Sequence, residues 1–303
     1  MTKRWATTTT EISSVSGTQV FSGGACNILD AHGQLLRNQE RDRINDWLSE
    51  KGIQFFDPQI HPDTHDVEYD YKIHHRVEVA ARRAAKINLY EVSPRTFGGI
   101  TSLEIALDHF KGQEPTVIYY SDGDPDKDIL PAHSVQGHPL FMPDGYQENE
   151  IAMLAHYREF IKNANHMRTF IIGLAQQLPT LTITFSQQAQ ENDIVITPER
   201  MHASDLFRAA VKAASGERVF VNFMGGSDIR DLDGNPLFVV PEKPTPMDMK
   251  TLLDQYVDDG NDLRRQIAKL VNISVYLRVV YTQKAAIMAL EELLKIKDIL
   301  PAG

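Results

Sequence analysis

The sequence predicts an α/β fold, in which an open parallel sheet is flanked by helices and followed by a mostly helical C-terminal extension. Three observations lead to this prediction. Short apolar segments alternate with helical ones over residues 18–145, as in β-α-β units. Turn-forming pairs such as Gly23-Gly24 and Asp57-Pro58 follow the apolar segments. Beyond residue 145, apolar residues recur mainly at helical intervals.

The first half contains a loose tail and an α/β domain. Residues 1–17 carry a threonine run and no periodic pattern, so we expect a flexible tail, and residues 18–145 form the domain. Its expected elements are, in order, a strand at 19–22, a helix at 37–51 closed by Gly52, a strand at 53–56, a helix at 68–86, a strand ending at 92, a helix ending at Gly112 and a strand at 116–120.

Residues 146–303 begin with alternating helices and strands and end in a mainly helical stretch. The expected elements are a helix at 146–177 broken near 163–165, strands at 181–185 and 218–223 around a helix at 203–214, a turn at 241–246, and two or three helices within 248–297. Leu277 and Val280 count among the helical positions of the last stretch. This region either covers the sheet or forms a contact between subunits.

Composition excludes several classes of protein. The chain has 303 residues, 42% of them hydrophobic and 24% charged, as in ordinary globular proteins. The formal net charge of -10 argues against a nucleic acid polymer or an anionic membrane as partner. Cys26 is the single cysteine, which fits a reducing compartment and makes the cytoplasm the expected location. No stretch of the sequence is apolar for long enough to predict a membrane span or a signal peptide.

The carboxyl ends of the predicted strands are the expected binding site. In open parallel sheets ligands gather at this edge, so Gly23, Asp57, Ser93 and the loop before Glu104 should converge on one crevice. We expect Thr101 or Ser102 to cap the following helix, which places Glu104 in its first turn. A carboxylate there either stabilises the helix end or faces a substrate.

Other candidate residues are weaker on their own. Ser22, Gly23 and Gly24 can offer hydroxyl and backbone donors to a phosphate, and Asp57 can bind a sugar or a base edge, although Asp-Pro is also an ordinary turn. His74-His75-Arg76 either contacts a phosphate or the leaving base, or lies on a solvated helix face.

Sequence motifs that are typical of several kinds of site are missing from this chain. The histidines have no metal-binding spacing, so we expect no metal site. Patterns for a dinucleotide fingerprint, a P-loop or a serine-hydrolase elbow are missing from the sequence. Cys26 has no base partner that the sequence identifies, and it is expected to pack at the strand end.

Taken together, several segments resemble the nucleoside 2-deoxyribosyltransferase superfamily over roughly residues 18–145. The most specific is the loop and helix of the Gly-x-Thr-x-x-Glu type, which here contains Gly99, Thr101 and Glu104. The other segments are Val20 to Ala25, Phe55 to Pro58, the helix with Glu78 and Arg82, and Leu89 to Val92.

The resemblance implies a fold, a reaction and a set of site residues. It implies a flavodoxin-like sheet, a multimeric enzyme and Glu104 as the nucleophile that attacks the anomeric carbon of a sugar. Gly99, Thr101 and Ser102 then belong to the substrate-binding loop. Two positions depart from the family. Gly98 stands where many members have an aspartate, and Phe21 matches a tyrosine that orients the nucleophile.

The first functional hypothesis is cleavage or transfer at the N-glycosidic bond of a nucleoside or nucleoside monophosphate. A carboxylate can stabilise or trap the oxocarbenium character that develops at the anomeric carbon. Glu104 would be the nucleophile, and Glu91 would assist the leaving base or orient the substrate. No cofactor is required. Transfer and hydrolysis stay open as alternatives, as do a noncatalytic nucleotide-binding sensor and a structural protein built on the long helices.

Overall fold

The computed structural model describes residues 12–24, 28–29, 35–36, 38–60, 71–93, 98–111, 114–121, 150–197, 202–224, 244–270 and 277–301. Its helices are η2 (Ile12–Val15, a 3-10 helix), α1 (Gln39–Glu50), α2 (Tyr71–Ala84), α3 (Gly99–Lys111), α4 (Glu150–Ala175), α5 (Ala203–Ala214), α6 (Pro246–Lys269) and α7 (Gln283–Ile296). Its strands are β1 (Val20–Gly24), β2 (Ile28–Leu29), β3 (Leu35–Leu36), β4 (Phe55–Phe56), β5 (Ile87–Val92), β6 (Thr116–Tyr120), β7 (Leu181–Thr184), β8 (Ile194–Ile196), β9 (Val219–Phe223) and β10 (Leu277–Val280).

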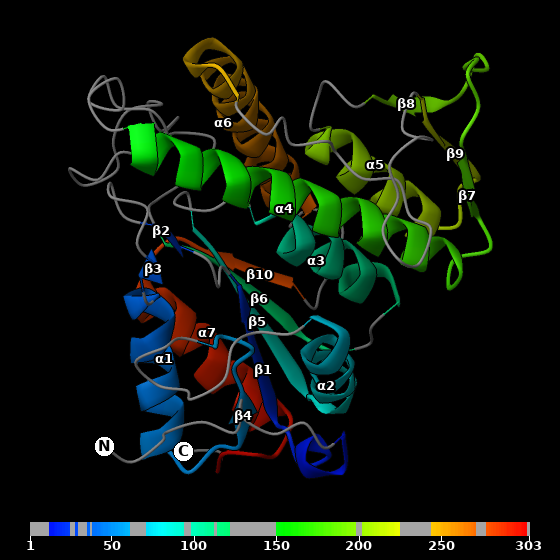
Figure 1. Ribbon diagram of the computed structural model, residues 1–303. Helices are drawn as coiled ribbons and strands as arrows, with labels where there is room; N and C mark the ends of the chain where they lie inside the picture. The colour runs from blue at the N-terminus through cyan, green and yellow to red at the C-terminus, as the bar shows by residue number, and fades with distance from the viewer. Residues whose placement is uncertain are drawn as a thin grey trace.

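A parallel sheet of five strands forms the lower half of the molecule in Figure 1. Its order is β10-β6-β5-β1-β4, and every neighbouring pair is parallel. Numbered along the chain, these strands run 2-1-3-4-5 from the β4 edge, which is the order of flavodoxin-like folds. The prediction of an open parallel sheet flanked by helices is therefore confirmed.

The two faces of this sheet are covered by different helices. Leu89 of β5 packs in one apolar cluster with Leu48 of α1 and Leu290 of α7. Its neighbour Tyr90 packs in the other cluster, with Ala81 of α2. Because successive side chains of a strand point to opposite faces, odd-numbered residues of β5 face α1 and α7, and even-numbered residues face α2 and α3.

A second layer lies over the α2 and α3 side. In Figure 1 the long helix α4 crosses above α3, with α5 and α6 beside it. The apolar cluster that contains Tyr90 continues into this layer through residues such as Phe170 of α4 and Phe207 of α5. A small parallel sheet of order β7-β9-β8 stands at its outer end. Helices α4, α5 and α6 thus form a layer that packs on α3, whereas β10 and α7, which also belong to the C-terminal region, extend the first sheet and cover its other face.

Several boundaries follow from local chemistry. Thr245 and Asp248 form a reciprocal capping box at the start of α6, and Pro246 occupies its first turn. Asn38 caps α1 by accepting from the Arg41 backbone N–H, and Thr282 caps α7 through Ala285. These polar side chains satisfy backbone donors that a helix start leaves without partners.

Four expectations about elements are corrected. Helix α4 runs unbroken through Asn163 and Asn165, because neighbours such as Ile161 and Met167 keep burying its apolar side. Residues 277–280 form strand β10 and not a helix, since they extend the sheet beside β6. Strands β2, β3 and β8 were not expected from the sequence. Within the expected tail, residues 12–15 form η2 and Val15 is buried, whereas residues 1–11 lie outside the described ranges.

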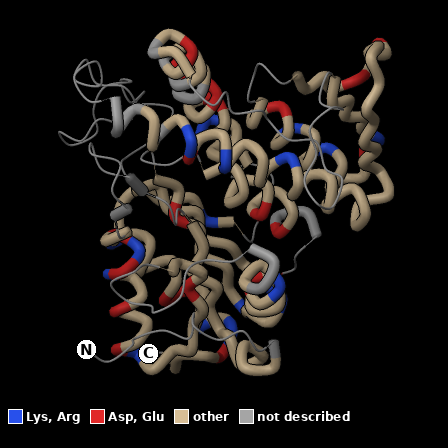
Figure 2. The backbone as a smooth tube through the Cα atoms, in the orientation of Figure 1, with Lys and Arg blue, Asp and Glu red and all other residues tan. Residues whose placement is uncertain are grey.

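Charged residues of both signs are mixed along the described backbone in Figure 2. On α1, for example, Arg43 contacts Glu40 one turn away. No helix of the described ranges is long and apolar enough to cross a bilayer.

Candidate ligand-binding site

The carboxyl ends of β1 and β5 meet where the strand order reverses. In the register of these strands Gly24 lies beside Glu91, and a Cβ added to Gly24 would lie 2.5 Å from the Glu91 carbonyl oxygen. Gly24 also has φ 137, which L side chains rarely adopt. Gly23 and Gly24 were expected to form a turn after the strand, but they are the last two residues of β1. Gly24 brings two backbones together at the edge where ligands of such sheets usually bind.

Gly24→Ala should lower the free energy of unfolding by more than 2 kcal/mol, since backbone strain alone costs about 1–3 kcal/mol and the clash with Glu91 adds to it. Gly52→Ala is the matched control, because Gly52 also has a positive φ but a Cβ there meets nothing within 4 Å. We expect that control to cost about 1 kcal/mol. Urea denaturation measures both, and equal losses would show that the close approach to Glu91 is unimportant.

Three of the predicted site residues belong to a buried network that joins α1 to the sheet. Ser22 donates to the Asn45 side chain at 2.7 Å, and Asn45 donates to Asp57 at 2.7 Å. Asp57 also contacts the guanidinium of Arg41 at 3.1 Å, with both side chains fully buried. Asn38, the cap of α1, donates to Glu91 at 2.5 Å. Ser22, Asp57 and Glu91 thus hold the amino end of α1 against the carboxyl edge of the sheet.

The predicted nucleophile occupies a different place from the one expected. Helix α3 begins at Gly99, so Glu104 lies in its second turn and not in its first. Its Oε1 atom lies 2.7 Å from Nη1 of Arg82 on α2, and the Glu104 side chain is 11% exposed. Burial raises the pKa of Glu104 to about 7, although Arg82 acts in the opposite direction. A carboxylate held by an arginine in the interior is not positioned as a free nucleophile.

Glu104 and Glu91 do not lie together. Glu91 is on the α1 face of the sheet, as its bond to Asn38 shows. Glu104 pairs with α2 on the opposite face. The sheet therefore separates the two carboxylates that the sequence suggested as partners.

The first turn of α3 contains the other predicted loop residues. Gly99, Thr101 and Ser102 are buried, and the Ser102 hydroxyl donates to the Gly98 carbonyl at 2.7 Å. The loop of residues 94–97, from which a ligand at the carboxyl edge would be approached, lies outside the described ranges, as does Cys26. The expected cap at Thr101 or Ser102 is wrong, because α3 already begins at Gly99 and both residues lie inside its first turn.

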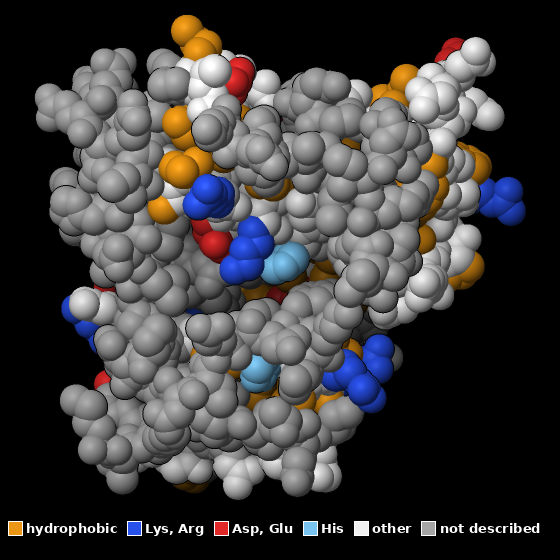
Figure 3. Space-filling view, viewed as in Figure 1, with side chains coloured by type: hydrophobic (Ala, Val, Ile, Leu, Met, Phe, Trp, Pro, Cys, Tyr) orange, Lys and Arg blue, Asp and Glu red, His pale blue; other side chains and the backbone are white. Residues whose placement is uncertain are grey.

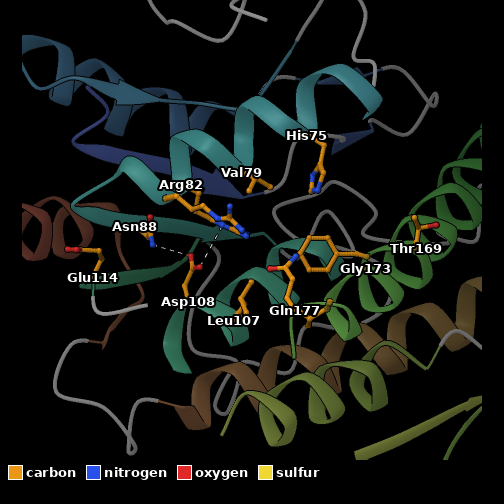
Figure 4. Close-up of a pocket in the computed structure, with 13 residues that line it drawn as sticks. His75, Val79, Arg82, Asn88, Leu107, Asp108, Glu114, Thr169, Gly173 and Gln177 are labelled. Atoms are coloured by element: carbon orange, nitrogen blue, oxygen red, sulfur yellow. Dashed lines mark hydrogen bonds and ion pairs between the residues drawn. The ribbon is translucent and has the colours of Figure 1, made fainter. Parts of the chain in front are cut away.

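A pocket of about 470 Å³ lies between α2, α3 and α4, on the face of the sheet that carries Glu104. Glu104 itself does not line it, whereas Asp108, one turn further along α3, does. The pocket residues are His75, Val79, Arg82 and Arg83 of α2, Asn88 of β5, Leu107 and Asp108 of α3, Glu114, and Thr169, Phe170, Gly173, Leu174 and Gln177 around α4. Its walls thus come from both halves of the chain (Figure 4).

The carboxylate of Asp108 has several polar contacts in this pocket. Its Oδ2 accepts from the Tyr90 hydroxyl at 2.5 Å and from Asn88 Nδ2 at 3.1 Å. Nε of Arg82 lies 3.7 Å from its Oδ1. Burial raises the pKa of Asp108, and Arg82 counters that rise. Arg82 therefore lies between two carboxylates, Glu104 outside the pocket and Asp108 inside it.

The other end of the pocket is aromatic. The rings of His75 and Phe170 meet edge to face with centroids 6.1 Å apart. Burial and the charge of Arg82 lower the pKa of His75 to about 4, so its imidazole is neutral at pH 7. Figure 4 shows His75, Thr169 and Gly173 at this end, away from Asn88, Asp108 and Glu114. On the face seen in Figure 3, basic and histidine side chains lie close together near the centre.

Sequence reasoning placed the site at the sheet edge and missed the pocket. Asn88, Asp108 and Phe170 are not among the residues that the sequence predicts for a site, and for His75 the sequence allows either a ligand contact or a solvated helix face. A helical spacing of four residues between Glu104 and Asp108 was the available signal. This spacing could not predict the pocket, because helix α4, which forms its other wall, lies in the second half of the chain.

Within the described ranges, no group of three or more histidine, cysteine, aspartate or glutamate side chains is arranged to hold a metal ion. Searches against models of protein families, curated proteins and solved structures returned no match.

Proposed function

We propose that the chain is a binding protein for a nucleoside or nucleotide, which it holds in the pocket between α2, α3 and α4. The observation that carries this proposal is the origin of the pocket walls, since α2 and α3 flank the first sheet and α4 belongs to the C-terminal region. A volume of about 470 Å³ is typical of small-molecule sites. A ligand there contacts both halves at once, so its binding is coupled to the packing of the helical layer.

The lining suits a molecule with a flat apolar part and a polar part. Phe170, Leu107 and Val79 offer an apolar surface for a base. Asn88, Asp108 and Arg82 offer hydrogen-bonding groups for a sugar or a phosphate. The nucleoside class itself comes from the resemblance of residues 18–145 to the nucleoside 2-deoxyribosyltransferase superfamily.

A second candidate function is cleavage or transfer at the N-glycosidic bond, with Glu104 as the carboxylate. The pKa of about 7 at Glu104 favours it, because such perturbed carboxyl groups cluster at functional sites. Arg82 contacts Oε1, so attack on a sugar requires the ligand to approach the second oxygen or to draw Arg82 away. Glu91 has no part in this version, since it lies on the other face of the sheet.

Thermal unfolding with a panel of nucleosides and their monophosphates tests the binding proposal. A ligand that binds only the native state must raise Tm, and we expect at least one member of the panel to do so. Phe170→Ala should remove the shift, whereas Phe220→Ala, at an exposed position on β9, should not. The proposal fails if no member of the panel shifts Tm.

Chromatography of the same mixtures separates the two candidate functions. If a nucleoside or nucleotide binds and no free base is released, the result supports a binding protein without catalytic activity. Free base that is released by the wild-type chain and lost in Glu104→Gln establishes the cleavage function, because glutamine keeps the shape but cannot attack as a carboxylate.

The proposal also includes a homo-oligomeric protein of the cytoplasm. The oligomer follows from the resemblance, and the compartment is supported by the single cysteine. Light scattering coupled to size exclusion measures the oligomeric state.

A further inference from the structure

One residue in the wall of the pocket has no side chain. Gly173 lies in the last turn of α4 and is the only glycine of that helix. Glycine is less stable than alanine inside a helix, so it is usually kept there for its backbone conformation, for close packing or for a function.

Neither backbone conformation nor close packing explains Gly173. Its φ is not positive, unlike that of Gly24 or Gly52. A Cβ built on Gly173 meets no atom of the described chain within 4 Å, whereas a Cβ on Gly23 would lie 2.7 Å from the ring of Phe21. Gly173 also lines the pocket, so a ligand can touch the backbone of α4 at this position.

The neighbours of Gly173 on α4 suit a flat ring. Phe170 and Leu174 are buried, and both line the pocket. Thr169 and Gln177 line it too, and their spacing of four residues on either side of Gly173 places them on the same side of the helix. The side chains of both can donate and accept hydrogen bonds. This wall therefore offers backbone and apolar surface to the face of a ring, and polar groups to its edge.

We propose that Gly173 makes the pocket selective for a purine base, whose second ring lies over the backbone of α4 at this position. This inference rests on the proposed nucleoside function and names its base. Figure 4 shows Gly173 at the same end of the pocket as His75. Phe170 precedes Gly173 by three residues, which is about 4.5 Å along the helix axis. A single ring packed on Phe170 ends short of the open position, whereas a fused second ring extends over it.

The same geometry discriminates against a pyrimidine base. A pyrimidine leaves the space over Gly173 unfilled and loses the contact with α4 that the second ring of a purine makes. A missing apolar group in a pocket weakens binding roughly 10-fold or more. The selectivity for the base is thus set by α4, which lies outside the residues 18–145 that resemble the family.

The test measures dissociation constants of deoxyadenosine, deoxyguanosine, deoxycytidine, thymidine and their monophosphates by calorimetry. On the wild-type chain we expect the purines to bind roughly 10-fold more tightly than the pyrimidines. In Gly173→Ala the new methyl group occupies the place of the second ring, so purine binding should weaken roughly 10-fold and the ratio should fall toward one. In Gly173→Leu the purines should no longer bind. Gln176→Leu adds the same side chain at an exposed position outside the pocket lining, and it should keep the wild-type ratio.

The stability of the unliganded chain gives an independent measurement. Because a Cβ at Gly173 meets nothing within 4 Å in the described ranges, Gly173→Ala should raise Tm by about 1–3 °C while it weakens purine binding. A glycine that is kept for the fold would give the reverse. A lower Tm with an unchanged ratio of affinities therefore overturns the inference.

The outcomes separate this inference from the function on which it rests. Purines and pyrimidines that bind the wild-type chain equally well overturn the assignment of the base and leave the proposed function standing. An unchanged ratio in Gly173→Ala does the same. If none of the nucleosides or monophosphates binds, the proposed function falls, and the assignment of the base falls with it.

Discussion

Replacing Arg41 with alanine should lower the free energy of unfolding by about 3–5 kcal/mol, which is the cost of removing one partner from a buried ion pair. Arg41 and Asp57 are 3.1 Å apart, and neither side chain is exposed. Arg41 also donates to Gln59 at 2.9 Å. Its loss removes the guanidinium from a buried carboxylate that also accepts from the Asn45 amide and the Gln59 backbone N–H. Chemical denaturation monitored by circular dichroism measures the change.

Arg43 provides the matched control on the same helix. It pairs with Glu40 one turn away, and its side chain is 61% exposed. Exposed pairs of this kind contribute about 0–1 kcal/mol, so Arg43→Ala should be nearly neutral. Similar losses in both variants would mean that the Arg41 network does not hold α1 to the sheet.

The partners of Arg41 explain why part of the predicted site has a structural role. Asp57 follows a short strand and precedes a proline, which predicted either a ligand contact or a turn. The deciding fact is the position of Arg41 and Asn45 on α1, whose side chains reach Asp57 only after the helix has packed on the sheet. Such tertiary contacts have no local pattern in the sequence.

The fold was more accessible to prediction than the site. Helix α5 begins and ends where its apolar pattern does, at Ala203 and Ala214, and β6 matches its apolar run. Residues 277–280 were assigned to a helix because Leu277 and Val280 also fit a helical interval. A short apolar run does not distinguish a buried strand from a helix until its neighbours are known.

Which side chain of α3 lines the pocket depends on how the neighbouring helices pack against α3. Helical geometry places Glu104 and Asp108 on one side of α3, and this much could be predicted. The packing of α2 and α4 against α3 decides the rest. It brings this side of α3 to Arg82, and it lets Asp108 but not Glu104 line the pocket. The motif of the resembling family identified the element that borders the pocket, but not the residue that faces it.

Arg82→Met should destabilise the protein strongly at pH 8 and much less at pH 5. Arg82 lies between Glu104, at 2.7 Å, and Asp108, at 3.7 Å. Methionine keeps most of the volume but leaves two buried carboxyl groups without their cation. Where both are ionised we expect a loss of about 3–5 kcal/mol, and at pH 5, where Glu104 is protonated, the loss should be smaller.

The pH dependence follows from the pKa of Glu104, which is about 7 in the folded chain against an ordinary value of 4.5. The folded state therefore binds more protons than the unfolded state between these values, so the wild-type chain already loses stability as the pH rises from about 4.5 to about 7. Arg82 lowers the pKa values of both Glu104 and Asp108. Its removal raises them further, which extends the loss of stability to higher pH.

Denaturant titrations at pH 5 and pH 8 measure this effect, with Arg83→Met as the control at an exposed neighbouring position of α2. That control should stay within about 0.5 kcal/mol of the wild-type chain at both pH values. Adding Glu104→Gln to Arg82→Met should recover much of the stability at pH 8, because one buried charge is then removed together with its partner. A loss that is equal at both pH values, or that Glu104→Gln leaves unchanged, would show that Arg82 stabilises the fold through packing and not through these carboxylates.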